Sequence, residues 1–228
     1  VLPYFRKLEN HPSGESEYHG GSGPISITPM KGETHPICDV FLKGCDELGY
    51  PQSDDFNGPK FEGSGIYDVN TKDGQRSSSS FAHLHPALSR PNLTVEHYAL
   101  VDRVLFENER ATGISVTQHG VVRTFQARKE VILCAGAVDT PKILQLSGVA
   151  DQALLARHQI PLVKHLPAVG QNLQDHLCVS YYYKANIPTL NDQLNSLFGQ
   201  FKLGLKYLLT RKGALAMSVN QAGGFFRG

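Results

Sequence analysis

The residues best suited to bind a ligand lie at 131–150, in the sequence VILCAGAVDTPKILQLSGVA. Residues 131–134 form a continuous apolar run, which predicts a strand buried on both faces. Ala135, Gly136 and Ala137 follow as a turn with almost no side chain, so a ligand can approach the backbone closely. A strand, a glycine turn and a helix present backbone amides to phosphates or dinucleotides in many α/β proteins. The pattern also fits an ordinary strand-to-helix connection, and spacing alone favours that interpretation.

The helix that follows this turn has its own start and stop signals. Thr140 is suited to cap it, and Pro141 to occupy its first position, where a missing N–H costs no hydrogen bond. Ile143 and Leu144 then begin an apolar face, and Gly148 supplies the stop. We therefore expect a short helix that begins at Pro141 and ends just before Gly148.

Composition limits the class of protein. The chain has 228 residues, 40% hydrophobic and 19% charged, as in a soluble globular protein with one large or two small domains. The net charge of +1 gives no global field that would attract nucleic acid or an anionic membrane. No apolar run is long enough to cross a bilayer. We expect no nucleic-acid partner, no transmembrane span and a cytoplasmic location, with peripheral membrane association as an option.

Cysteine and histidine spacing does not indicate a metal site. The four cysteines, at positions 38, 45, 134 and 178, include no CxxC pair, so we expect buried thiols in a reducing compartment. His83 and His85 are two residues apart, but no carboxylate or cysteine nearby has matching ligand spacing. We assign no metal ligand.

The remaining patterns predict elements of mixed type. Three β-strands joined by tight turns form a predicted meander at residues 100–106, 112–117 and 121–127. A further strand is expected at 179–184, where three tyrosines occur in succession. Helices are expected at residues 36–48, at 77–88 with a break at Pro86, at 151–158 and at 193–209.

A set of motifs runs along nearly the whole chain in a fixed order: PYFRKLEN, DDFNG, Arg76-Ser77-Ser78, LHPAL, RPNLTV, ALVDRVLFE, EVILCAGA, TPKILQLSG, VGQNLQDH and QAGGFFRG. Together they resemble the glucose-methanol-choline (GMC) family of FAD-dependent oxidoreductases, and within it the choline dehydrogenase-like branch. One departure is visible, because Gly148-Val149-Ala150 stands where the family usually has Gly-apolar-Gly.

The resemblance implies an α/β fold with α+β portions. Part of an FAD-binding dinucleotide fold, with the β-meander and the buried parallel strand, would be interleaved with part of an antiparallel-sheet substrate domain. Residues 76–171 would belong to the FAD-binding domain, and residues 1–75 to a substrate or cover segment. Residues 172–228 would form a truncated substrate-domain segment.

The resemblance also implies which residues contact FAD. In similar proteins the valine of the ALVDRVLF strand touches adenine through its backbone, which points to Val101 here; its side chain would be core in either case. Ala135 and Gly136 would approach the cofactor through their open backbone. Asn172 lies in the VGQNLQDH motif with Asp175 and His176, and it is expected to contact FAD. That motif could equally be a hydrogen-bonded turn that supports the domain junction.

Two parts of such an enzyme are missing from these residues. No GxGxxG with a preceding strand and a following helix occurs, although this motif normally holds the FAD pyrophosphate. The family's catalytic histidine would lie beyond residue 228, so no catalytic residue is assigned within this chain. We expect an internal segment that is inactive alone. Its partners would be the missing N- and C-terminal segments of the same protein and a small-molecule alcohol.

In the complete protein the implied activity is oxidation of an alcohol with hydride transfer to FAD, in the EC 1.1 class. Relatives that work as lyases or decarboxylases on the same flavin scaffold give one alternative, and an inactive folded fragment gives another. Tyrosines at 181–183 would suit a quaternary ammonium such as choline through cation–π attraction, although aromatic residues on strands more often pack in sheets. Primary, aromatic and aliphatic alcohols stay open as substrates.

Overall fold

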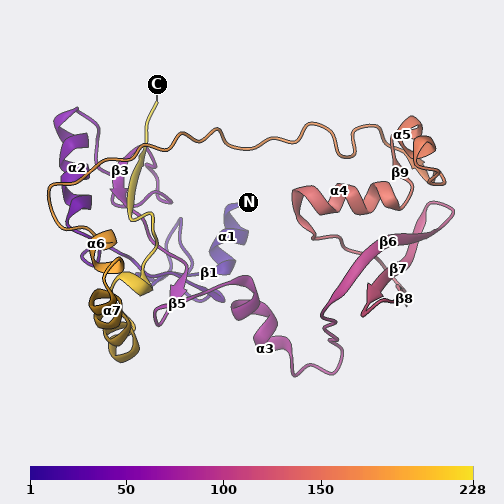
Figure 1. Ribbon diagram of the computed structural model, residues 1–228, viewed down its shortest axis with the longest axis horizontal. Coiled ribbons are helices and arrows are strands. Elements are labelled where there is room, and N and C mark those ends of the chain that lie inside the picture. Colours follow the sequence, from indigo (N-terminus) through magenta and orange to yellow (C-terminus); the bar gives the residue numbers. More distant parts are fainter. Residues whose placement is uncertain (228) are drawn as a thin grey trace. The chain divides into compact units, whose positions relative to one another are not determined.

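The computed structural model describes residues 1–227, and these residues form two compact units (Figure 1). Unit 1 contains residues 1–93 together with the chain from Tyr182 onward, and unit 2 contains Thr94–Tyr181. Gly228, the last residue of the QAGGFFRG motif, lies outside the described residues. The predicted α/β class with antiparallel portions is confirmed, because both units mix helices with small sheets. The assignment of residues to FAD and substrate domains stays a prediction.

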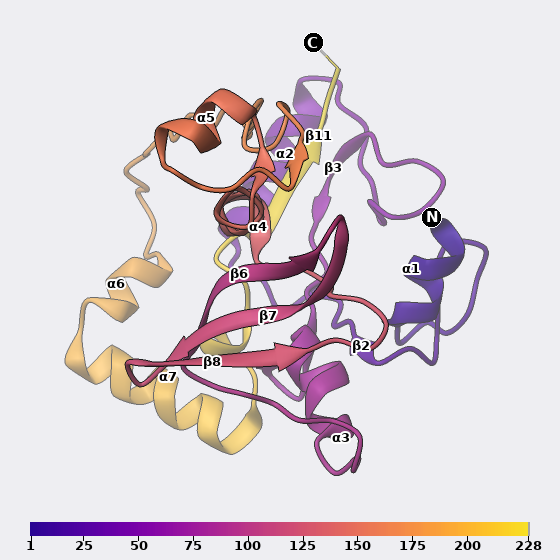
Figure 2. The same ribbon diagram turned by 90° about the vertical axis from the view of Figure 1, so that its right-hand side faces the viewer.

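Unit 2 is organised around a three-stranded antiparallel meander, whose strands lie side by side in Figure 2. Its strands are β6 (Ala99–Glu107), β7 (Arg110–Gln118) and β8 (Val121–Gln126), in the order of the chain. Each turn contains a non-glycine residue with positive φ, Asn108 in the first and His119 in the second. The predicted meander is therefore confirmed with its two tight turns.

The helix α4 (Gly136–Leu146) packs against β6 through a buried serine at its C-terminal end. The Ser147 hydroxyl accepts a hydrogen bond from the Val104 backbone N–H at 2.8 Å and donates to the Ile143 carbonyl. Gly148 has φ +86° and ends the helix, as predicted. The remaining elements of unit 2 are β9 (Val149–Ala150), which pairs in parallel with β10 (Lys164–His165), and α5 (Gln152–Arg157), capped by the Asp151 carboxylate.

The predicted start of α4 is wrong by several residues. The helix begins at Gly136, and Pro141 lies inside it instead of at its first position. Thr140 does not cap this helix; its hydroxyl accepts a hydrogen bond from the Ala135 backbone N–H at 3.1 Å. The side chain therefore stabilises the turn that enters the helix, and the positive φ of Gly136 sets the helix start.

Two predicted strands do not form in the described residues. Residues 131–134 lie outside every strand, and Ile132 is 73% exposed where burial on both faces was expected. Residues 179–184 are likewise outside every strand, with the rings of Tyr181, Tyr182 and Tyr183 exposed. A strand needs a neighbouring backbone to satisfy its N–H and C=O groups, and no segment of the described residues pairs with either stretch.

Unit 1 joins segments that are far apart in the sequence. The strand β3 (Gly63–Ile66) pairs antiparallel with β11 (Ala222–Phe225), with Gly65 opposite Gly223. The other strands are β1 (Glu9–Asn10) parallel to β2 (Ile25–Ser26), and β4 (Thr71–Lys72) antiparallel to β5 (Gln75–Arg76). The helices are α1 (Leu2–Leu8), α2 (Ile37–Glu47), the π-helix η1 (Ser80–Leu84), α3 (His85–Ala87), α6 (Leu190–Leu194), α7 (Leu197–Thr210) and the 3₁₀ helix η2 (Ala214–Ala216).

Two further expectations need correction. The helical segment after residue 79 continues past Pro86 to Ala87 instead of breaking there, and its hydrogen-bond pattern changes from π to α at His85. Only two of the four thiols are buried: Cys38 and Cys45 lie inside on α2, whereas Cys134 and Cys178 are exposed. No helix among residues 1–227 combines the length and the apolarity that a bilayer span requires.

Gly148 allows a direct test of the packing in unit 2. A Cβ at this position would lie 2.3 Å from the Pro161 carbonyl oxygen, and the positive φ adds strain for any other residue. We expect Gly148→Ala to lower the free energy of unfolding by about 3 kcal/mol. Gly120→Ala is the matched control, since Gly120 also has positive φ but has no atom within 4 Å of its Cβ position; it should cost about 1 kcal/mol. Equal losses in urea unfolding would contradict the predicted close contact.

Candidate functional site

The turn at the start of α4 leaves the backbone open. Residues 134–139 are exposed, and a Cβ at Gly136 would meet no atom within 4 Å. Gly136 has φ +84°, a conformation that favours glycine. The first N–H groups of a helix have no intrahelical partners and carry partial positive charge, so this turn fits an anionic group such as a pyrophosphate.

Val101 lies on β6, the strand that packs against α4, so both predicted contacts belong to unit 2. The residue is half-buried and pairs with Val116 on β7. The register shifts between Val101 and Arg103, and the carboxylate of Asp102 accepts hydrogen bonds from the Thr117 and Ser115 hydroxyls. The irregularity interrupts the ladder next to Val101, and the adenine contact of Val101 stays a prediction.

Asn172 lies in an exposed segment without helix or strand. Its φ is +56°, and its side-chain oxygen accepts a hydrogen bond from the Gln174 amide at 3.3 Å. Asp175 accepts one from the His176 backbone N–H at 2.8 Å. These contacts are local, as in the hydrogen-bonded turn that the sequence left open, and the cofactor role of Asn172 stays a prediction.

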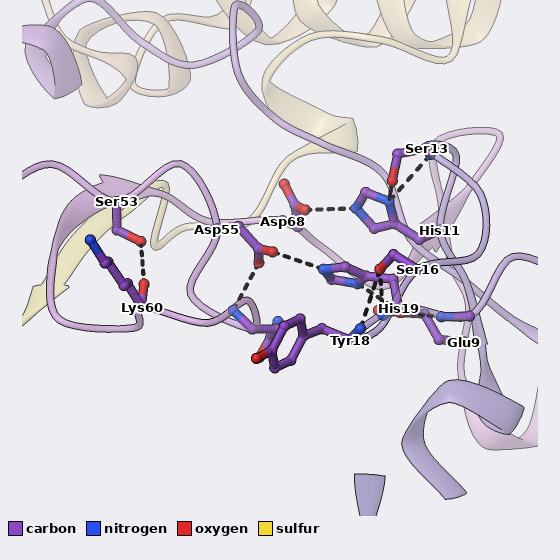
Figure 3. A network of polar contacts seen from close by, with 12 residues as sticks. Glu9, His11, Ser13, Ser16, Tyr18, His19, Ser53, Asp55, Lys60 and Asp68 are labelled. Carbon is purple, nitrogen blue, oxygen red and sulfur yellow. Dashed lines mark hydrogen bonds and ion pairs between the residues drawn. The ribbon is translucent and has the colours of Figure 1, made fainter. Parts of the chain in front are cut away.

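A polar cluster in unit 1 was not anticipated from the sequence (Figure 3). His19 is buried, with Nδ1 2.9 Å from the Glu9 carboxylate and Nε2 2.9 Å from the Asp55 carboxylate. An ionised carboxylate accepts hydrogen bonds and does not donate them, so both contacts are satisfied when the ring is protonated on both nitrogens, as an imidazolium. The cluster therefore ties the N-terminal segment to the DDFNG loop by charge-assisted hydrogen bonds.

The surroundings shift the pKa values of His19 and Asp55. Burial lowers the pKa of His19, but the hydrogen bonds to Asp55 and Glu9 outweigh it and raise the pKa above its ordinary 6.5. Burial raises the pKa of Asp55, whereas the hydrogen bonds from His19 and from the Asn57 backbone hold it below its ordinary 3.8. Both shifts favour the charged pair.

A second histidine extends the cluster. His11 Nε2 lies 3.2 Å from the Asp68 carboxylate, and its ring lies against that of His19 with centroids 4.5 Å apart. These groups line a cavity of about 320 Å³, which Ser64 also lines. Within the part of the chain that the structure describes, no three such side chains are grouped as metal ligands. The cluster residues follow no repeating spacing in the sequence, so no pattern could have found them.

A larger cavity of about 600 Å³ lies elsewhere in unit 1. Its walls come from α2, from α6 and from residues 214–222, so the two predicted substrate-domain segments meet in it. Gln221 is buried on the wall, where its side-chain oxygen accepts a hydrogen bond from the His35 backbone N–H at 2.8 Å. The other walls are mostly apolar, as in a small-molecule site.

Comparisons with known proteins identify relatives over nearly the whole chain. A family model described as GMC oxidoreductase matches residues 1–178. Oxygen-dependent choline dehydrogenases are similar: that of Yersinia pseudotuberculosis is 42% identical and that of Escherichia coli K12 is 41% identical, each over 99% of this chain. This chain spans 40% of the first relative and 41% of the second.

Solved structures share the fold. An FAD-dependent oxidoreductase from Chaetomium thermophilum has a TM-score of 0.86 and 27% identity, over 97% of this chain and 41% of its own. A formate oxidase has a TM-score of 0.84 and 26% identity, over 99% of this chain and 41% of its own. FAD as the cofactor of the family is thereby confirmed.

The His19 cluster predicts a particular pH dependence. A raised histidine pKa contributes stability below pH 6.5 that is lost as pH rises through the raised value, and a lowered Asp55 pKa contributes stability above pH 3.8 that is lost as pH falls. We expect His19→Gln to lower the free energy of unfolding by about 2 kcal/mol near pH 5.5, and by less near pH 8.5. His83→Gln, at an exposed histidine of the same unit, should show no such difference. A pH-independent loss in His19→Gln would refute the charged pair.

Proposed function

Because this chain belongs to the GMC oxidoreductase family, we propose that it forms part of an FAD-dependent enzyme that oxidises an alcohol by hydride transfer to the flavin. The observation that carries the proposal is the 42% identity with a choline dehydrogenase over 99% of this chain. The open turn at Gly136 supports it, because that turn lies in the EVILCAGA motif and fits an anionic group.

Three places in unit 2 would hold the cofactor. Ala135 and Gly136 would approach the cofactor through their open backbone, the backbone of Val101 would face adenine, and Asn172 would add a polar contact. When bound, FAD supplies an acceptor for the hydride that leaves the alcohol carbon. We assign no residue of this chain to take the hydroxyl proton.

The substrate is an alcohol that enters unit 1. The 600 Å³ cavity supports this, since apolar walls with few polar groups such as Gln221 can orient a small alcohol. Choline is one candidate, and primary, aromatic and aliphatic alcohols are the others. The three tyrosines at 181–183 are exposed, so they lend no support to an aromatic cage in this structure. We also propose a cytoplasmic location.

Gly136 provides a test of the cofactor site. We expect Gly136→Val to reduce the FAD bound to the purified full-length protein by roughly tenfold or more, because a branched side chain would fill the space through which FAD reaches the backbone. Gly120→Val is the matched control: Gly120 has φ +79° and equally open surroundings, but lies in the β7–β8 turn. Flavin absorbance per protein and circular dichroism measure the outcome. Equal flavin in both variants would remove Gly136 from the site.

The reaction class has its own test. Anaerobic addition of the correct alcohol to the flavin-loaded full-length protein should bleach the visible flavin absorbance, because the flavin becomes reduced. Choline, a primary aliphatic alcohol and an aromatic alcohol are compared at equal concentration, with the matching aldehydes as controls. If no alcohol bleaches the flavin while the protein retains FAD, the oxidoreductase proposal fails and a lyase or decarboxylase becomes the better description.

A further inference from the structure

The 600 Å³ cavity of unit 1 has no acidic or basic chain ends on its walls. Its lining residues, as far as the structure describes them, include no aspartate, glutamate, lysine or arginine. The carboxylate of Asp192, next to the lining residue Asn191 in the sequence, instead accepts hydrogen bonds from the Thr189 backbone N–H and hydroxyl at 2.6 and 2.8 Å. A charged ligand would therefore leave water here without gaining an opposite charge.

Gln221 is a buried polar side chain on this wall, 9% exposed, and its amide has a fixed orientation. Its Oε1 accepts a hydrogen bond from the His35 backbone N–H at 2.8 Å, and the Cys38 thiol lies 3.6 Å from the same oxygen. A backbone N–H donates only to the oxygen of an amide, so Nε2 must be the other atom. Within residues 1–227 that NH₂ group has no hydrogen-bond partner, so it is a donor available to a ligand oxygen.

We propose that this cavity selects an uncharged alcohol, and that Gln221 Nε2 donates a hydrogen bond to an oxygen of that alcohol. The inference rests on the function proposed above and narrows its substrate class. Apolar side chains from three segments, among them Phe41, Leu190 and Met217, would surround the carbon body of the alcohol. The amide would then orient the molecule, because it is held in place by its own contact with the His35 backbone.

A quaternary ammonium such as that of choline fits this cavity poorly. Its cationic head has no lone pair that could accept a hydrogen bond from Gln221 Nε2, and the NH₂ end of an amide carries partial positive charge, which repels a cation. Phe41 supplies the only phenyl ring among the described lining residues and is 44% exposed, so the walls form no aromatic cage. The charge of the substrate, more than its size, is therefore what the cavity discriminates.

Two alcohols of nearly the same shape isolate the effect of charge: choline, and 3,3-dimethylbutan-1-ol, in which carbon replaces the ammonium nitrogen. In the flavin-loaded full-length protein we expect the neutral alcohol to have the larger kcat/KM, by about tenfold or more. Gln221→Glu should shift this ratio toward choline by about tenfold or more. The new carboxylate keeps an oxygen for the His35 backbone N–H and replaces only the donor, by a negative charge.

The matched control is Gln75→Glu, which makes the same substitution at an exposed glutamine on β5, outside the cavity. It should leave the ratio of the two kcat/KM values unchanged. A wild-type preference for choline over 3,3-dimethylbutan-1-ol would overturn the proposal. So would a folded Gln221→Glu protein, by circular dichroism, whose ratio equals that of the wild type.

Protection of Cys38 tests the cavity without turnover, because this thiol lies on its wall. At ten times its dissociation constant, 3,3-dimethylbutan-1-ol should slow labelling of Cys38 by methyl methanethiosulfonate about tenfold; choline at the same concentration should have little effect. Cys178, exposed in unit 2, is the internal control in the same mass-spectrometric assay. Protection without flavin bleaching would support the neutral-ligand cavity while the proposed reaction fails. If the neutral alcohol does not protect Cys38, the cavity inference itself fails.

Discussion

The buried hydrogen bond between the Val104 backbone N–H and the Ser147 hydroxyl decides how unit 2 is assembled. A buried N–H without a partner is costly, so the end of α4 must stay against β6 for that donor to be satisfied. Gly148 then turns the chain sharply enough for β9 to pair with β10. The position of the open turn at Gly136 depends on this arrangement, because the turn is the other end of the same helix.

The two units satisfy polar groups in different ways. In unit 2 backbone groups are paired through a meander and one serine, and charged side chains stay near the surface. In unit 1 the strands are short, and charged side chains link separate segments: His19 joins Glu9 to Asp55. The charged pair of His19 and Asp55 therefore makes the stability of unit 1 depend on protonation.

The open turn of α4 is an exposed feature of unit 2, with space around Gly136 that no other atom of the unit fills. It is polar backbone at a helix N-terminus, which suits an anionic partner. Family membership supports a flavin nucleotide as the proposed partner of this turn.

Local signals in the sequence were enough to predict the meander, the helix α2 and the helix stop at Gly148, because tight turns and helix periodicity depend on only a few neighbouring residues. The ordered motifs were enough to predict the family. They were not enough for residues 131–134 and 179–184, whose apolar runs become strands only beside a partner backbone. The Gly136 turn was foreseen because a glycine turn is local. The His19 cluster was not, because it brings together residues 10 and 36 positions apart, and only tertiary folding can do that.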